Sequence, residues 1–150
     1  MVGKGEAKQT LEIEVPKLGL VSYTEQQRFT SEHGLVGLPD FHRYVMIEKD
    51  SVAPFQYLVC EEDASFFVLV IDPRLVRADY QLEMERSELN DLSLASGDET
   101  AIFVIASFNE NPKDTTLNFK GPIVFNLTQG KFQQVIDEKG ELKSPLFAGQ

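Results

Sequence analysis

The sequence predicts a mostly β fold, a small antiparallel β-barrel-like or sandwich domain with one short capping helix. Nine short segments are rich in β-branched and aromatic residues, and Gly, Pro, Asn and Asp residues lie between them at regular spacing. Such spacing is typical of sandwiches and barrels. The expected strands are Gln9–Val15, Leu20–Tyr23, Arg43–Ile47, Phe55–Cys60, Phe66–Ile71, Tyr80–Met84, Ala101–Phe108, Ile123–Leu127 and Phe132–Ile136.

The pattern inside these segments indicates which of them are central. Gln9–Val15 alternates apolar residues with Thr and Glu, as a strand with one face in water does. Phe66–Ile71 and Ala101–Phe108 are instead apolar on both faces over most of their length, which predicts strands covered on each side. We therefore expect a core formed by the following side chains: Phe67, Leu69, Ile71, Phe103 and Ile105.

The expected helix begins near Ser87, an acceptable N-cap residue. It carries Leu89, Leu92 and Leu94 and ends before Gly97, because Gly commonly follows the last turn of a helix. This helix is short and is predicted to cap one end of the β structure.

Length and composition predict one globular domain. The chain has 150 residues, of which 42% are hydrophobic, and this length is sufficient for a single core. We expect residues 9–147 to form the domain and residues 1–8 to be a disordered tail. No apolar run approaches the ~18 residues of a membrane span, and the N-terminus lacks the apolar core of a signal peptide. These observations predict a cytoplasmic protein that does not enter a membrane.

The sequence offers few residues for catalysis or cofactor binding. The single cysteine, Cys60, excludes an internal disulfide and is expected to be buried. The two histidines, His33 and His42, do not form the clusters with Cys that zinc sites use. Neither a nucleophile elbow nor a glycine-rich phosphate loop is present in the sequence. We therefore expect no metal and no cofactor.

The negative charge is concentrated in the middle of the chain. The net charge is -10, and the segment from Glu48 to Asp114 contains 15 acidic and 5 basic residues, so the rest of the chain is balanced. Such a surface repels phosphates, which argues against direct nucleic acid binding. The acids also have a plain interpretation, as residues that keep the protein in solution.

The stretch Gly34–Phe41 runs into an aromatic and apolar strand. It resembles the Gly-Leu-Pro-Gly-Phe pattern of the FliW family, although Val36 and Leu38 differ from that pattern. Pro54–Leu58 and Gly121–Asn126 resemble two further family segments, and the likeness extends over most of the chain from Gly34 to Ile136. The residues after Ile136 do not fit the family's usual ending.

The resemblance implies a small β-barrel-like protein without enzymatic activity. It also implies a flagellar assembly factor with two protein partners, flagellin and the RNA-binding translational repressor CsrA. When flagellin is exported, the freed factor would bind CsrA and relieve repression of flagellin synthesis, an exchange between competing equilibria. The protein is expected to be a monomer when free.

The partner contacts are expected to involve exposed acids of the middle segment. A connection between strands and the outer face of a strand should expose the carboxylates of Glu61, Glu62, Asp63, Glu83 and Glu85. Two alternatives stay open at this point. One is a small acidic β-barrel enzyme that uses carboxylates such as Asp63 or Asp79, and the other is an acidic structural domain without a dedicated partner.

Overall fold

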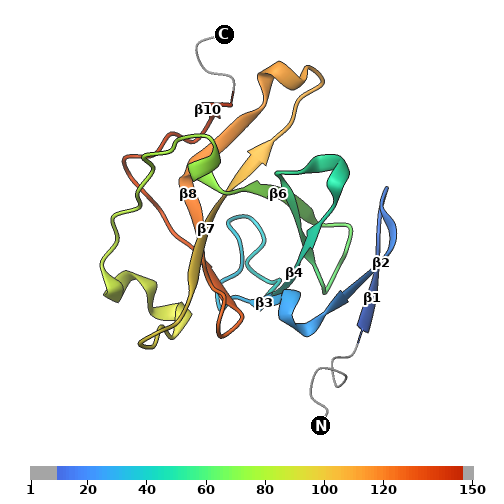
Figure 1. Ribbon diagram of the computed structural model, residues 1–150, viewed down its shortest axis with the longest axis horizontal. Coiled ribbons are helices and arrows are strands. Elements are labelled where there is room, and N and C mark those ends of the chain that lie inside the picture. The colour runs from blue at the N-terminus through green and yellow to red at the C-terminus, as the bar shows by residue number, and fades with distance from the viewer. Residues whose placement is uncertain (1–9, 147–150) are drawn as a thin grey trace.

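The structure, a computed structural model, describes residues 10–146 and is built mainly of β-strands (Figure 1). The predicted tail, residues 1–8, lies outside the described residues. The elements are, in chain order, β1 (Thr10–Val15), β2 (Gly19–Thr24), η2 (Glu25–Gln27), β3 (Arg28–Thr30), β4 (Arg43–Glu48), η3 (Asp50–Val52), β5 (Gln56–Cys60), β6 (Phe67–Ile71), η4 (Pro73–Leu75), η5 (Arg86–Leu92), β7 (Thr100–Ser107), η6 (Pro112–Asp114), β8 (Thr116–Asn126), β9 (Lys131–Gln134) and β10 (Ser144–Pro145). The η elements are short 3₁₀ turns.

Strands β3 to β9 close into a barrel. Each strand from β3 to β8 pairs antiparallel with the strand that follows it in the chain. The barrel closes where β9 runs parallel to β3, with Thr30 opposite Lys131. Closure leaves few free strand edges, which is one way in which all-β domains avoid unwanted pairing.

The barrel interior is filled by aromatic and aliphatic side chains. Phe125 lies at its centre, with ring centroids 5.0 Å from Phe29, 5.4 Å from Phe103 and 5.5 Å from Phe132. Edge-to-face contacts such as those with Phe29 and Phe103 are favourable beyond the area that they bury. Cys60 is buried in the same cluster, as predicted.

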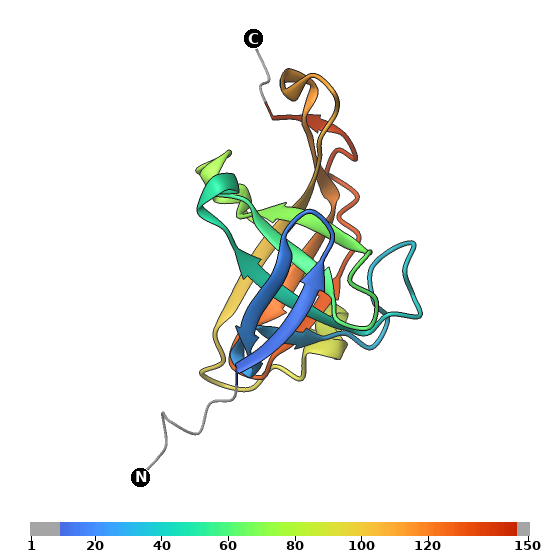
Figure 2. The same ribbon diagram turned by 90° about the vertical axis from the view of Figure 1, so that its right-hand side faces the viewer.

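The β1–β2 hairpin packs on the outside of this barrel, as Figure 2 shows. Its inward residues Val15, Val21 and Tyr23 cover Val45, Ile47 and Val59 on β4 and β5. This contact explains why β4 is apolar on both faces: alternate residues face the interior and the hairpin.

Two expected elements differ from the structure. Tyr80–Met84 is not a paired strand; the structure assigns it no secondary structure. The helix expected near Ser87 is a 3₁₀ segment, η5, in which Leu89 leaves helical geometry at φ -108° and ψ 38°. The segment nevertheless covers the barrel wall, with Leu92 buried beside Val124.

The core prediction is correct for the strands and partly wrong for their residues. Among the five side chains expected to be buried, only Ile71 is fully so, whereas Phe67, Leu69, Phe103 and Ile105 are half-buried. The neighbours Val70 and Val104 are fully buried instead. Hydrophobicity on both faces therefore located these strands without showing which of their residues are covered most completely, since burial in β6 depends on position along the strand.

Candidate protein-binding surface

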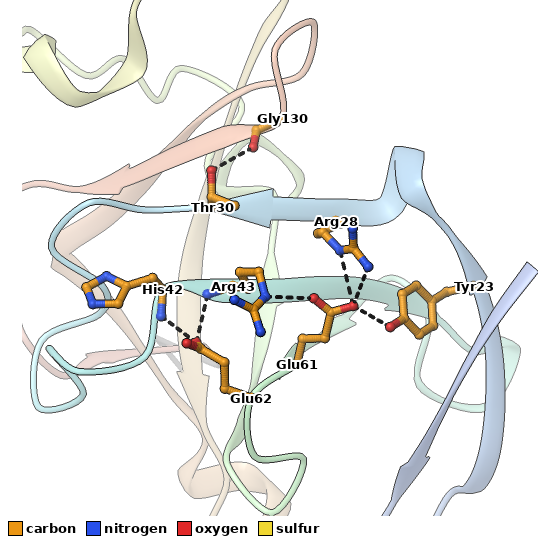
Figure 3. Close-up of polar contacts among 8 residues, drawn as sticks. All are labelled: Tyr23, Arg28, Thr30, His42, Arg43, Glu61, Glu62 and Gly130. Atoms are coloured by element: carbon orange, nitrogen blue, oxygen red, sulfur yellow. Dashed lines mark hydrogen bonds and ion pairs between the residues drawn. The ribbon is translucent and has the colours of Figure 1, made fainter. Parts of the chain in front are cut away.

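The first group of candidate acids lies in the connection from β5 to β6, and Glu61 directly follows β5 (Figure 3). Its carboxylate accepts hydrogen bonds from the Tyr23 hydroxyl of β2, from Arg28 of β3 and from Arg43 of β4. Arg28 donates from Nη2 at 2.8 Å and from Nε at 3.1 Å, and Arg43 donates from Nε at 3.2 Å. The Glu61 side chain is 12% exposed.

These contacts give Glu61 a structural function. Burial by itself would raise the pKa of Glu61, but the hydrogen bonds from Tyr23, Arg28 and Arg43 outweigh it and hold the pKa below its ordinary value. The charged carboxylate thus ties the outer hairpin to the barrel. The prediction that Glu61 is exposed is wrong, because residues distant in sequence enclose it.

The next two acids remain at the surface. Glu62 is exposed, and its Oε1 accepts the backbone N–H groups of His42 at 2.6 Å and of Arg43 at 3.0 Å. Partial burial opposes ionisation of Glu62, but these two hydrogen bonds outweigh it and lower its pKa. Asp63 is exposed and accepts from the Ser65 hydroxyl at 2.6 Å, which lowers the pKa of Asp63. Both carboxylates are charged at neutral pH and open to a partner.

Glu83 and Glu85 lie on the segment between η4 and η5, and both are exposed as predicted. Glu83 Oε1 lies 3.3 Å from Lys139 Nζ, in an ion pair whose side chains are 78% and 85% exposed. Such an open pair contributes little to stability. The segment that carries these acids crosses the outside of the barrel on the side opposite the β5–β6 connection (Figure 1).

The structure therefore separates the candidate acids into two places on the surface. One place comprises Glu62 and Asp63, and the other comprises Glu83 and Glu85. The prediction that all are exposed acids of the middle segment holds for these four residues. Sequence reasoning missed the arginines that neutralise Glu61, since Arg28 is separated from it by 33 residues and no local signal connects the two.

The residues that carry the FliW resemblance serve local backbone geometry. Gly34 has φ +68°, and a Cβ there would lie 2.6 Å from the Leu38 carbonyl oxygen, so a side chain would not fit. Gly121 donates its backbone N–H to Asn118 Oδ1 at 2.9 Å, a contact within β8. These motif residues therefore fix the backbone of one loop and of one strand of the barrel.

The arrangement offers little for catalysis or metal binding. Asp63 and Asp79, the carboxylates of the enzymatic alternative, both lie in exposed turns. Within residues 10–146, no three or more His, Cys, Asp or Glu side chains come together as a metal site. In the same part of the chain, no helix has the length and apolar character needed to cross a membrane.

Comparison with known proteins decides the family. A family model described as FliW protein matches residues 12–146. The chain belongs to the FliW family. The flagellar assembly factor FliW of Leptospira biflexa serovar Patoc is 30% identical over 138 residues, which is 90% of each chain. The FliW of Thermosipho africanus is 29% identical over 133 residues and covers 87% of this chain and 92% of that protein.

The FliW fold is also recognised in three dimensions. A crystal structure of the flagellar assembly factor FliW superposes with a TM-score of 0.83 at 22% sequence identity, covering 93% of this chain and 99% of that one. The family resemblance and the mostly β class predicted from the sequence are confirmed. The match extends to residue 146, beyond Ile136, where the sequence motifs lose their likeness to FliW.

Proposed function

We propose that this protein is a cytoplasmic flagellar assembly factor that binds flagellin and CsrA in turn and so relieves CsrA repression of flagellin synthesis. The observation that carries the proposal is membership of the FliW family over residues 12–146, since the relatives are named flagellar assembly factors. The protein acts as a monomer when free and does not contact RNA itself. Its role is regulatory binding and not catalysis.

The exposed acids supply a physical basis for antagonism toward an RNA-binding protein. A surface that grips RNA must be basic, so an acidic protein docked beside it lowers the positive potential that holds the phosphates. The range of this effect is about 8 Å at physiological ionic strength. Only acids close to the RNA path contribute, and the candidates are Glu62, Asp63, Glu83 and Glu85.

The test is an RNA competition titration with CsrA at two salt concentrations. Wild type is compared with a variant that combines Glu62→Gln, Asp63→Asn, Glu83→Gln and Glu85→Gln, while Glu61 is left intact because it supports the fold. The expected result is weaker inhibition by the neutralised variant and a smaller difference at high salt. Equal inhibition at both salts would refute the electrostatic mechanism, and failure of wild type to bind both flagellin and CsrA would refute the function.

A further inference from the structure

The segment that precedes η5 has no secondary structure and no pairing partner. Within the described residues, no main-chain N–H or C=O of residues 81–84 forms a hydrogen bond. The stretch is bounded by a turn in which Tyr80 N donates to Arg77 O at 3.0 Å, and by Glu85, whose N–H donates to Glu88 Oε1 at 2.9 Å. Main-chain groups without partners can pair with an added strand.

The side chains of this segment alternate as they do in a strand. Leu82 and Met84 are half-buried against the cluster of Leu92, Val124 and Val135 on the barrel wall. Gln81, Glu83 and Glu85 are exposed on the other side. Burial therefore alternates along residues 81–85 as the sequence pattern does, although no other strand pairs with this segment.

Hollows on both sides of the segment leave space for such a neighbour. One has a volume of about 390 Å³ and is mostly apolar where it meets Leu82, Met84, Leu94 and Ile102. The other, of about 230 Å³, is lined by residues that include Tyr80, Glu83, Phe119 and Lys139. Figure 1 shows the segment crossing the outside of the barrel, away from the β1–β2 hairpin.

We propose that residues 80–85 form a docking strand for an extended segment of a partner protein in which basic and apolar side chains alternate. The partner's main chain would pair with residues 81–84, its apolar side chains would enter the hollow beside Leu82 and Met84, and its basic side chains would face Glu83 and Glu85. Opposite charges on neighbouring strands are favourable. This inference rests on the proposed role as a protein-binding factor.

Charge identifies the occupant as a different protein. A second copy of this chain would place its own Glu83 and Glu85 near those of the first, and its net charge of -10 would oppose approach. The ion pair of Glu83 with Lys139 is open to water on both sides, so a partner lysine or arginine can replace it at little cost.

The docking strand can be tested with a synthetic probe. A ten-residue peptide that alternates lysine and valine is titrated into the full-length protein, and amide shifts and hydrogen exchange are followed by NMR. We expect the amides of residues 81–84 to exchange rapidly in the free protein and to become protected on binding. A peptide with N-methyl groups on alternate residues lacks the donors and should bind about tenfold more weakly.

Two charge variants complete the test. Glu83→Lys should weaken binding of the lysine–valine peptide about three- to tenfold, as expected for loss of one cross-strand charge pair and gain of repulsion. Glu110→Lys, at another exposed site, makes the same change in net charge and should alter affinity less than about twofold. Equal binding of the N-methylated peptide, or protection elsewhere, would overturn the proposal.

The outcomes also separate this inference from the proposed function. If flagellin and CsrA bind wild type and Glu83→Lys equally while the peptide leaves residues 81–84 unprotected, the docking strand is refuted and the function stands. If neither protein binds wild type while the peptide protects these amides, the function is refuted and the strand site stands. Protection of the same amides by self-association, detected by sedimentation, would identify a second copy as the occupant and overturn the proposal.

Discussion

Replacement of Glu61 by Gln tests whether the enclosed carboxylate holds the outer hairpin on the barrel. The change keeps the size of the side chain and removes the charge that Tyr23, Arg28 and Arg43 contact. Hydrogen bonds to a charged group contribute roughly 1.5–3 kcal/mol when buried, whereas exposed ion pairs contribute roughly 0–1 kcal/mol. Arg28 is 33% and Arg43 51% exposed, so solvent screening places the total loss near the lower end, at about 1–2 kcal/mol.

The assay is urea unfolding at neutral pH. With a slope of about 2 kcal/mol per molar urea, the expected loss lowers the midpoint by about 0.5–1 M. Glu110→Gln, a change at an exposed site, is the matched control and should leave the midpoint in place. Hydrogen exchange should also rise across residues 10–24 in Glu61→Gln, because the hairpin loses its polar link to the barrel.

The pH dependence provides the second half of this test. The folded state lowers the pKa of Glu61, so the carboxylate stabilises the protein fully above its unfolded value and loses this contribution as pH falls through the folded pKa. The difference between wild type and Glu61→Gln should be constant above about pH 5 and should shrink at lower pH. An equal midpoint for Glu61→Gln and its control, or a difference that does not depend on pH, would refute the reasoning.

Three further predictions concern the barrel and its loops. Phe125→Ala should lower the free energy of unfolding by about 3–5 kcal/mol in urea, because Phe125 is fully buried at the centre of the barrel. Phe103→Ala should cost less, because Phe103 is half-buried; a larger loss for Phe103→Ala would contradict this assignment of the core. Gly34→Ala should lower the melting temperature more than Gly37→Ala, because both have positive φ but a Cβ at Gly34 meets backbone oxygens while that at Gly37 meets open space. Asn126→Ala should cost about 2–3 kcal/mol in the same unfolding assay, since the buried amide bonds to the Leu92 carbonyl at the end of η5 and to the Thr128 N–H after β8. An unchanged midpoint would show that water replaces the amide.

The sequence was sufficient to predict the strands that carry a continuous apolar run. β4 to β7 were found because each carries a continuous apolar run that only a covered strand tolerates. β3 was missed because its three residues are too few to show a period. The first half of β8, from Thr116 to Phe119, alternates as a strand should, and was overlooked because polar residues at alternate positions resemble a loop.

For the candidate acids, the local sequence pattern determines the exposure of some side chains and not of others. The sequence predicts correctly that Glu62 and Asp63 are exposed, because a turn exposes consecutive acids. It fails for Glu61, whose environment is created by Tyr23 of the outer hairpin and by Arg28, which the pairing of β3, β4 and β5 brings near. For residues 80–84 the sequence predicts a strand, whereas the structure has none there, because strand pairing depends on the whole fold.

The seam between β3 and β9 has a consequence for the order of events during synthesis. Thr30 N donates to Gly130 O at 2.9 Å, and this bond joins residues that are 100 positions apart. Contacts of such long range slow folding, because a large loop must close before they form. The barrel cannot complete itself until β9 has left the ribosome, and until then the edge of β3 and the apolar interior stay open to other chains.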